Sequence, residues 1–220
     1  MTTKSEKGFT ITELVISITV ASILALVLFA ATFYYYVSAA QSQAAADLAL
    51  ESQTILTQLT EDIRLSDAIA STNALPDPNA PTGGWATSDP SNILIIESPT
   101  VDSNRNIIYN NNTGDPYRNE FIYFQSGTTM YKRILANSSA TGNTAQTTCP
   151  ANKANSSCPP DRLFSANVSN LSFTFYDASD NTTSNATQAR SVSLEVDMAK
   201  KVFGKNVTLT NTTRVTLRNV

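Results

Sequence analysis

The sequence predicts an α+β fold, shaped like a lollipop, in which one long N-terminal helix packs on an antiparallel β-sheet head. Three observations carry this prediction. Residues 14–46 contain no charged side chain, and the first two dozen of them are mostly apolar. Residues 75–90 are rich in proline and glycine, which end helices. Beyond them, apolar and polar residues alternate in several segments, and this period of two is typical of strands.

Composition and charge exclude several classes of function. The chain has 220 residues, a net charge of −3 and no histidine. Without histidine it cannot use Ser-His-Asp or Cys-His catalysis or the histidine-containing zinc sites. The sequence also contains no phosphate-binding loop, dinucleotide motif or paired catalytic acids, so we expect no enzyme, no cofactor and no metal site.

Residues 14–37 are long and apolar enough to cross a membrane, because about 20 apolar residues span a bilayer as a helix. Lys4 and Lys7 precede them, so the positive-inside rule places the N-terminus in the cytoplasm. We therefore expect a single-pass protein of the cytoplasmic (inner) membrane with an extracytoplasmic head. The alternative is a cleaved signal peptide ending near Ala30 or Ala39, but its apolar region would be only roughly 7–15 residues long.

The first residues of this helix form a motif. The pattern Gly8-Phe9-Thr10-x-x-Glu13, followed by the apolar stretch, resembles the class III leader of type IV pilins and type II secretion pseudopilins. The resemblance implies that residues 1–8 are a leader peptide, which a prepilin peptidase removes by cutting between Gly8 and Phe9. It also implies that Phe9 is then N-methylated, and that residues 9–37 form the transmembrane helix and the filament core.

Glu13 needs a partner, because a carboxylate inside a membrane span costs about 2.5 kcal/mol or more. Cleavage would create one, the α-ammonium group of Phe9 on a neighbouring subunit. Such an ion pair is sensitive to register, so it can select correctly staggered subunits during assembly. The alternative is that Glu13 only marks the edge of the membrane, which leaves Gly8 and Phe9 unexplained.

Two residues depart from the family pattern, and one of them indicates which members of the family the chain resembles. Thr12 precedes Glu13 at a position that is usually apolar in the family. Ala30 stands where major type IV pilins often have a proline, and no proline occurs before Pro76. We therefore expect an unbroken helix, as in pseudopilins and many minor pilins.

Residues 38–74 are predicted to continue the helix outside the membrane. The apolar residues Leu48, Ile55, Leu56, Leu59 and Ile63 are spaced so that they form a stripe on one face. Together with the span they predict a helix of about 60 residues, on the order of 90 Å long. A free coiled coil is the alternative, but the apolar stripe is short and leads directly into the β-rich region.

The head is predicted to comprise residues 75–220 and one antiparallel sheet that the helix stripe covers on one face. Alternating apolar residues predict a hairpin over residues 120–135 that turns at 126–127, and a second turn at 203–206. The remaining predicted strands are residues 92–97, 106–109, 171–176, 191–198 and 207–219.

The two cysteines, Cys149 and Cys158, lie in a loop rich in proline, asparagine and serine. In an exported protein they are expected to form a local disulfide, whereas in the cytosol they would be free thiols. The predicted export favours the disulfide.

Three polar clusters have a plain structural interpretation. Asp177, Asp180 and Asn181 could ligate calcium, but a solvated turn fits them better because no EF-hand spacing is present. Basic residues near the last hairpin could contact DNA, although such charges more often protect an edge strand. They are Lys200, Lys201, Lys205, Arg190, Arg214 and Arg218. The Asn-x-Ser/Thr triplets at Asn137, Asn167 and Asn211 are expected in a chain rich in these residue types, so by themselves they are not evidence of glycosylation.

The resemblance implies a structural subunit, most similar to the W-type minor pilins and J-type minor pseudopilins. Segments that carry this finer likeness are ILTQLTEDIRLSDAI, LFSANVSNLSFTFYD and RVTLRN. The implied partners are other pilin or pseudopilin subunits, the prepilin peptidase, the membrane and an assembly platform. The alternatives are a major pilin, or a membrane-anchored adhesin that never polymerises.

Overall fold

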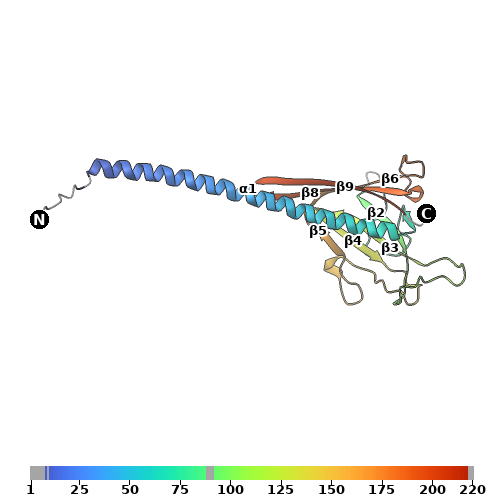
Figure 1. The fold of residues 1–220 in the computed structure, drawn as a ribbon. Helices are drawn as coiled ribbons and strands as arrows, with labels where there is room; N and C mark the ends of the chain where they lie inside the picture. The colour runs from blue at the N-terminus through green and yellow to red at the C-terminus, as the bar shows by residue number, and fades with distance from the viewer. Residues whose placement is uncertain (1–7, 9, 88–91, 218–220) are drawn as a thin grey trace.

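The computed structural model describes residue 8 and residues 10–87 and 92–217. A single long helix, α1 (Ile11–Leu65), projects from a β-rich head, and its C-terminal half lies on that head (Figure 1). The predicted α+β lollipop is confirmed. Below, the stem means residues 11–37 of α1, and the head means the sheets with their loops together with the half of α1 that packs on them, which are residues 38–87 and 92–217.

Helix α1 runs without interruption for 55 residues, or about 80 Å at 1.5 Å per residue. It ends at Leu65, nine residues before the boundary expected at residue 74. Ser66 stops it, since its backbone N–H and its Oγ both donate to the carbonyl of Ile63, at 3.2 and 2.7 Å. The next residue, Asp67, donates its N–H to the carbonyl of Glu97, so the chain leaves the helix by pairing with a strand.

Strands in the described part of the chain form two antiparallel sheets, where the sequence predicted one. The first has the order β1-β2-β3-β4-β5, with β1 (Ala68–Ala70), β2 (Ile93–Pro99), β3 (Arg118–Ser126), β4 (Thr129–Leu135) and β5 (Arg162–Ser165). The second has the order β7-β6-β8-β9, with β7 (Thr182–Thr183), β6 (Val168–Tyr176), β8 (Ser191–Val202) and β9 (Lys205–Thr216). Two short 3₁₀ helices, η1 (Ala151–Lys153) and η2 (Ala186–Gln188), complete the head.

The strand predicted at residues 106–109 does not form as a regular strand. Residues 106–109 form only isolated bridges, from Ile107 to Val101 and from Tyr109 to Pro116. The surrounding segment instead folds back on itself through Asp102, whose Oδ1 accepts the N–H groups of Asn104 and Asn106 at 2.8 Å. These local bonds compete with a regular strand, because short polar side chains satisfy the backbone in turns.

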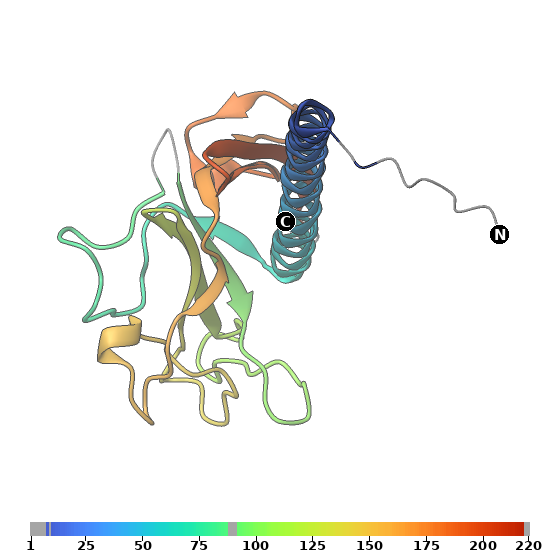
Figure 2. The same cartoon turned by 90° about the vertical axis from the view of Figure 1, so that its left-hand side faces the viewer.

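The core joins the helix to both sheets. Four residues of the predicted stripe are buried and pack with inward residues of β2, β3, β6 and β8, namely Leu48, Ile55, Leu59 and Ile63. The fifth, Leu56, is partly buried against the same cluster. Figure 2, which looks along α1, shows both sheets on the same side of the helix. Burying one such side chain contributes about 1.5–3 kcal/mol, so these four residues hold the helix firmly in place.

A smaller second cluster lies on the other side of the first sheet. Trp85, from the loop of residues 75–87, packs there on Ile95, Ile122 and Leu135. This loop therefore belongs to the packed head, although its proline and glycine content predicted only an interruption.

Candidate functional site

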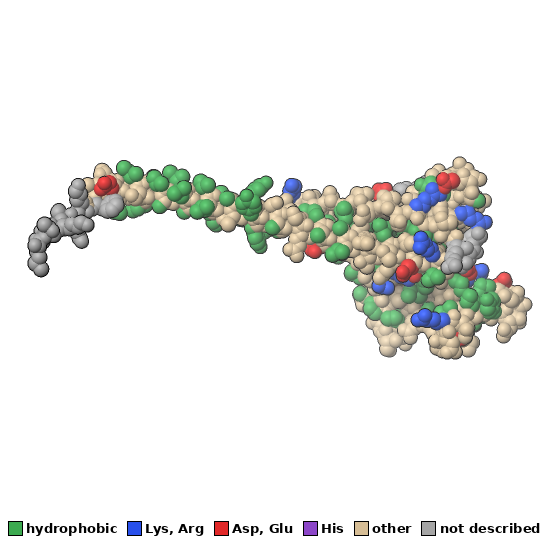
Figure 3. All heavy atoms as spheres, in the orientation of Figure 1, with side chains coloured by type: hydrophobic (Ala, Val, Ile, Leu, Met, Phe, Trp, Pro, Cys, Tyr) green, Lys and Arg blue, Asp and Glu red, His purple; other side chains and the backbone are tan. Residues whose placement is uncertain are grey.

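The stem is the first candidate functional region. Its large apolar residues are exposed on all sides, from Ile11 and Leu14 to Phe29 and Phe33. Figure 3 shows one face of the stem, with hydrophobic side chains along it. A helix that is apolar all round must be buried in a protein core or in a membrane. The head touches the stem near its last turns, at Phe33 and Tyr36, and leaves most of it uncovered. Among the described residues, α1 is the one helix long and apolar enough to cross a membrane.

Polar side chains within the stem are satisfied by the helix itself. The hydroxyls of Ser17, Thr19 and Ser22 each donate to the carbonyl four residues earlier, at 2.7 Å. A hydroxyl bonded in this way does not leave an unpaired donor in an apolar medium. The hydroxyl residues are therefore compatible with a membrane span.

Glu13 takes part in a capping box at the start of α1. The backbone N–H and the Oγ1 of Thr10 donate to Glu13 Oε2, at 3.0 and 2.8 Å. The Thr10 hydroxyl in turn accepts the N–H of Glu13 at 3.3 Å. The sequence signal for this box is Thr-x-x-Glu, which sequence reasoning overlooked because it treated Glu13 only as a membrane charge.

The predicted processing site lies at the edge of the described chain. Gly8 is exposed, whereas Phe9 and the leader residues 1–7 lie outside the described residues. The predicted cleavage, the N-methylation of Phe9 and the ion pair with Glu13 therefore stay predictions. The capping box gives Glu13 a partner within its own chain.

A buried ionic contact connects α1 to the first sheet. Asp62 Oδ2 lies 2.6 Å from Lys132 Nζ, and it also accepts the hydroxyl proton of Tyr123. Lys132 Nζ lies 4.0 Å from the ring centre of Phe121. Burial lowers the pKa of Lys132, and the charge of Asp62 opposes that change. Burial, and then the charge of Asp62, raise the pKa of Tyr123 well above its usual value.

Further polar contacts hold the same helix to β5 and β9. Glu51 accepts hydrogen bonds from Ser165 Oγ at 2.7 Å and from Asn167 Nδ2 at 3.1 Å. Asn211 Nδ2 donates to the buried Ser52 Oγ at 2.6 Å. These contacts fix the rotation of α1 relative to the head, because each requires one particular helix face.

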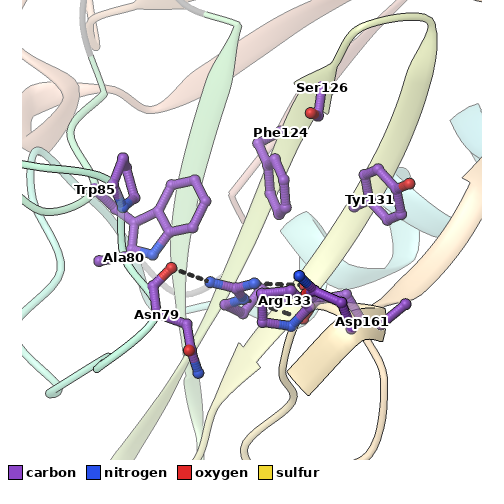
Figure 4. A pocket seen from close by; sticks show the side chains of 12 residues that line it. Asn79, Ala80, Trp85, Phe124, Ser126, Tyr131, Arg133 and Asp161 are labelled. Carbon is purple, nitrogen blue, oxygen red and sulfur yellow. Dashed lines mark hydrogen bonds and ion pairs between the residues drawn. The ribbon is translucent and has the colours of Figure 1, made fainter. Parts of the chain in front are cut away.

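A pocket of about 520 Å³ opens on the first sheet, beside the loop of residues 75–87. Aromatic rings form its wall, with the centre of Phe124 4.7 Å from that of Trp85 and 5.5 Å from that of Tyr131. Figure 4 shows Arg133 below these rings, between Asn79 and Asp161. The Arg133 side chain is 3% exposed and forms ion pairs with Asp77 at 2.9 Å and Asp161 at 2.6 Å.

The arginine acts as a structural clamp. Four of its five N–H groups bond within the described residues, to Asp77, Asp161 and the carbonyl of Asn79. Burial lowers the pKa of Arg133, but the hydrogen bonds and charges of Asp161 and Asp77 outweigh it and raise that pKa overall. Since one N–H group is left, Arg133 is poorly suited to bind an anionic ligand.

The other predicted site residues take simple structural positions. Cys149 and Cys158 form a disulfide, with Cα atoms 5.6 Å apart. Asp177 accepts the N–H groups of Ser179 and Asn181, which closes a turn. The described residues contain no group of three or more His, Cys, Asp or Glu side chains that could hold a metal ion.

The basic residues near the last hairpin are partly neutralised. Lys200 Nζ lies 3.5 Å from Asp47 Oδ2, and Arg214 pairs with Asp180 and covers the ring of Tyr176. Arg218 lies outside the described residues. Lys201 and Lys205 form no ion pair within the described part of the chain.

Comparison with known proteins gives one match. A family model described as the prokaryotic N-terminal methylation motif matches residues 3–29. None of the curated proteins matches the chain. The match therefore covers the motif and most of the stem, and it does not reach the head.

Proposed function

The chain carries the prepilin-type N-terminal motif of type IV pilins and type II secretion pseudopilins, and we propose that it is a minor subunit of such a filament. In this proposal it primes, caps or joins a type IV pilus, or a secretion or competence pseudopilus. Chains with this motif are structural subunits rather than enzymes, are processed by a prepilin peptidase and assemble with other subunits.

One observation carries the proposal. The motif of residues 3–29 opens a helix that is exposed and apolar on all sides and then continues into a folded head. An apolar stem of this kind suits two successive environments, the lipid bilayer and a bundle of other stems, because both bury it.

The proposed organisation follows from the motif. Residues 1–8 are a leader that remains in the cytoplasm until it is removed, and residues 9–37 cross the inner membrane. Residues 38–74 hold the amphipathic part of α1 and its exit into the first sheet, and residues 75–220 form the rest of the extracytoplasmic head. After assembly, the head faces the outside of the pilus or the cell surface.

Assignment as a minor subunit rests on the shape of α1. The helix continues through Ala30 without interruption. This agrees with the sequence, in which Ala30 stands where major type IV pilins often have a proline that kinks the helix.

Glu13 is proposed to change partners on assembly. In the isolated chain its carboxylate is held by Thr10 of the same helix. After cleavage, the α-ammonium group of Phe9 on a neighbouring subunit offers a full opposite charge. An ion pair between charged groups is stronger than a bond to a neutral donor, particularly in a medium of low dielectric constant.

N-terminal processing tests the proposal. The chain is expressed with a prepilin peptidase, and its intact mass and N-terminal sequence are measured. The expected product begins at N-methylated Phe9. Gly8→Leu is expected to abolish processing, whereas Ser5→Leu, which places the same side chain within the leader, is not. A mature chain that still begins at Met1 would refute the proposal.

Filament composition then separates a minor subunit from its alternatives. We expect purified filaments to contain the processed chain at a small fraction of the dominant subunit. Filaments in which this chain dominates would make it a major pilin. A processed chain that stays in the membrane and never enters filaments would favour an adhesin.

A further inference from the structure

The turn between β8 and β9 lies against the stem. Both strands run alongside α1 toward its N-terminal half (Figure 1). At the turn, the ring centre of Phe203 lies 6.4 Å from that of Phe33 and 5.7 Å from that of Tyr36, with the rings nearly perpendicular. We call residues 201–206 the hairpin tip.

The hairpin tip lies at the level where the apolar stem ends. Phe33 is 20 residues beyond Glu13, which corresponds to about 30 Å along a helix. The hydrocarbon layer of a bilayer is also about 30 Å thick. When Glu13 lies at the cytoplasmic boundary, Phe33, Tyr36 and the ring of Phe203 therefore reach the outer membrane interface. Aromatic side chains are favoured at this depth.

Phe203 occupies a backbone conformation that is unfavourable for its type. Its φ is +48° and that of Gly204 is +80°, so both central residues of the two-residue turn are left-handed. Asn-Gly is the favoured sequence for such a turn. A bulky aromatic residue there is strained, and such strain often accompanies function. The residue is also 55% exposed, so the head and the stem together bury less than half of its surface.

The exposed charges beside Phe203 are positive. Lys201 and Lys205 flank the turn and are exposed. Asp47 is the acidic residue that pairs with this part of the hairpin in the described chain, and its partner is Lys200. Figure 3 shows a cationic group beside hydrophobic side chains where the stem meets the head. Long cationic side chains can keep their ammonium groups among lipid headgroups while an aromatic neighbour enters the interface.

We propose that the hairpin tip is a second membrane contact, in which Phe203 inserts into the outer interface and Lys201 and Lys205 bind anionic phospholipid headgroups. This proposal rests on the proposed function, because it requires the stem to span a bilayer. Two contacts, the stem and the tip, fix both the height and the rotation of the head above the membrane before assembly.

Tryptophan fluorescence in vesicles of phosphatidylcholine and phosphatidylglycerol tests the tip. The full-length chain contains one tryptophan, Trp85, in the body of the head. The wild-type chain therefore supplies the background signal for two variants, Phe203→Trp at the tip and Leu24→Trp within the stem. Lipids brominated near the headgroup end or near the terminus of the acyl chain act as quenchers of known depth.

The stem variant and the tip variant are expected to differ in depth. The Leu24→Trp signal should be quenched most by lipids brominated at the chain terminus. The Phe203→Trp signal should be quenched about twofold more by lipids brominated near the headgroup, the depth preferred by interfacial aromatic residues. Trp85 of the wild-type chain should not be quenched.

Each failure has its own meaning. If Leu24→Trp is quenched and Phe203→Trp is not, the tip proposal is wrong and the membrane anchor stands. If neither is quenched, the anchor and the tip proposal are both wrong. If the tip signal shifts only as the protein-to-lipid ratio rises, without quenching, the tip packs on a second copy instead and the proposal is overturned.

Lipid charge provides a further test. Adding Lys201→Gln and Lys205→Gln to the Phe203→Trp chain should remove the gain in quenching that phosphatidylglycerol gives over pure phosphatidylcholine. The matched control, Arg64→Gln with Lys153→Gln, also removes two positive charges, but these residues lie elsewhere on the head. If both double variants lose this gain in quenching equally, the effect comes from net charge, and headgroup binding at the tip is contradicted.

Discussion

Asp62 of α1 and Lys132 of β4 form an ion pair of 2.6 Å that joins the end of the helix to the first sheet. The lysine side chain is buried, and the carboxylate also accepts the hydroxyl of Tyr123. A charge held in this way depends on its partner, because removing one member leaves the other buried and unpaired.

Asp62→Asn should therefore destabilise the head by about 2 kcal/mol, less than a fully buried pair because Asp62 retains some exposure. The reason is the unpaired ammonium group of Lys132. Urea unfolding of the detergent-solubilised chain, followed by near-ultraviolet circular dichroism, measures the change. Glu61→Gln, at an exposed position on the same helix, is the control and should have almost no effect. Equal effects of the two variants would contradict the proposed role of the pair.

Arg133→Met should destabilise the protein more strongly, by about 3–5 kcal/mol, because it leaves the carboxylates of Asp77 and Asp161 buried without a counter-charge. Arg133→Lys should recover only part of this loss, since an ammonium group cannot form the same forked bonds. Arg162→Met, on the exposed side of β5, is the control. The free energy of unfolding in urea measures all three, and full recovery in the lysine variant would contradict the clamp.

Glu120 should make stability depend on pH. Burial raises the pKa of Glu120 above 4.5, although the N–H groups of Ala74 and Leu75 act in the opposite direction. The folded state therefore binds its proton more tightly than the unfolded state. The contribution of Glu120 is greatest below pH 4.5 and falls as pH rises through the folded-state pKa. Unfolding of the wild type and Glu120→Gln at several pH values tests this, and their stability difference should shift against the wild type as pH rises.

The disulfide between Cys149 and Cys158 closes a short loop, with a sequence separation of 9. Loop-closure entropy for that length predicts a stabilisation of about 2.5 kcal/mol. The double variant Cys149→Ser and Cys158→Ser should lose that amount in urea unfolding. Addition of a reductant should lower the stability of the wild type to the same level and leave the double variant unchanged.

Three variants separate the two roles of Glu13. Glu13→Gln keeps an acceptor for the capping box but removes the charge, whereas Thr10→Val weakens the box and keeps the charge. If the ion pair drives assembly, Glu13→Gln should reduce incorporation into filaments about tenfold, with normal processing at Gly8, and Thr10→Val should have little effect. Glu13→Ala should resemble Glu13→Gln. If Thr10→Val and Glu13→Gln reduce incorporation into filaments equally, the helix cap, and not the ion pair, is what assembly requires.

Much of the fold could be predicted from local sequence patterns. The stripe of Leu48, Ile55, Leu59 and Ile63 and the hairpins of β3–β4 and β8–β9 follow from periodicity, and the structure confirms them. The end of α1 does not follow from periodicity alone. It depends on the pairing of residues 67–70 with β2, whose residues are about thirty positions away. Such non-local pairing overrides local helix propensity.

Among the polar sites, too, one could be predicted from the sequence and another could not. The capping box of Thr10 and Glu13 was readable from four consecutive residues and was missed. The clamp of Arg133 could not be predicted, because its partners Asp77 and Asp161 lie in loops on opposite sides of it in the sequence. Neither loop has a hydrophobic periodicity from which the position of its carboxylate on the sheet could be predicted.

The attachment of α1 has a mechanical consequence. The buried stripe, the Asp62–Lys132 pair and the Asp47–Lys200 pair are spread along the helix, from Asp47 to Ile63. A force that pulls on the stem therefore loads these contacts together, in shear, and does not peel them apart one after another. The head is built so that tension along the stem must break many bonds at once before the helix slips.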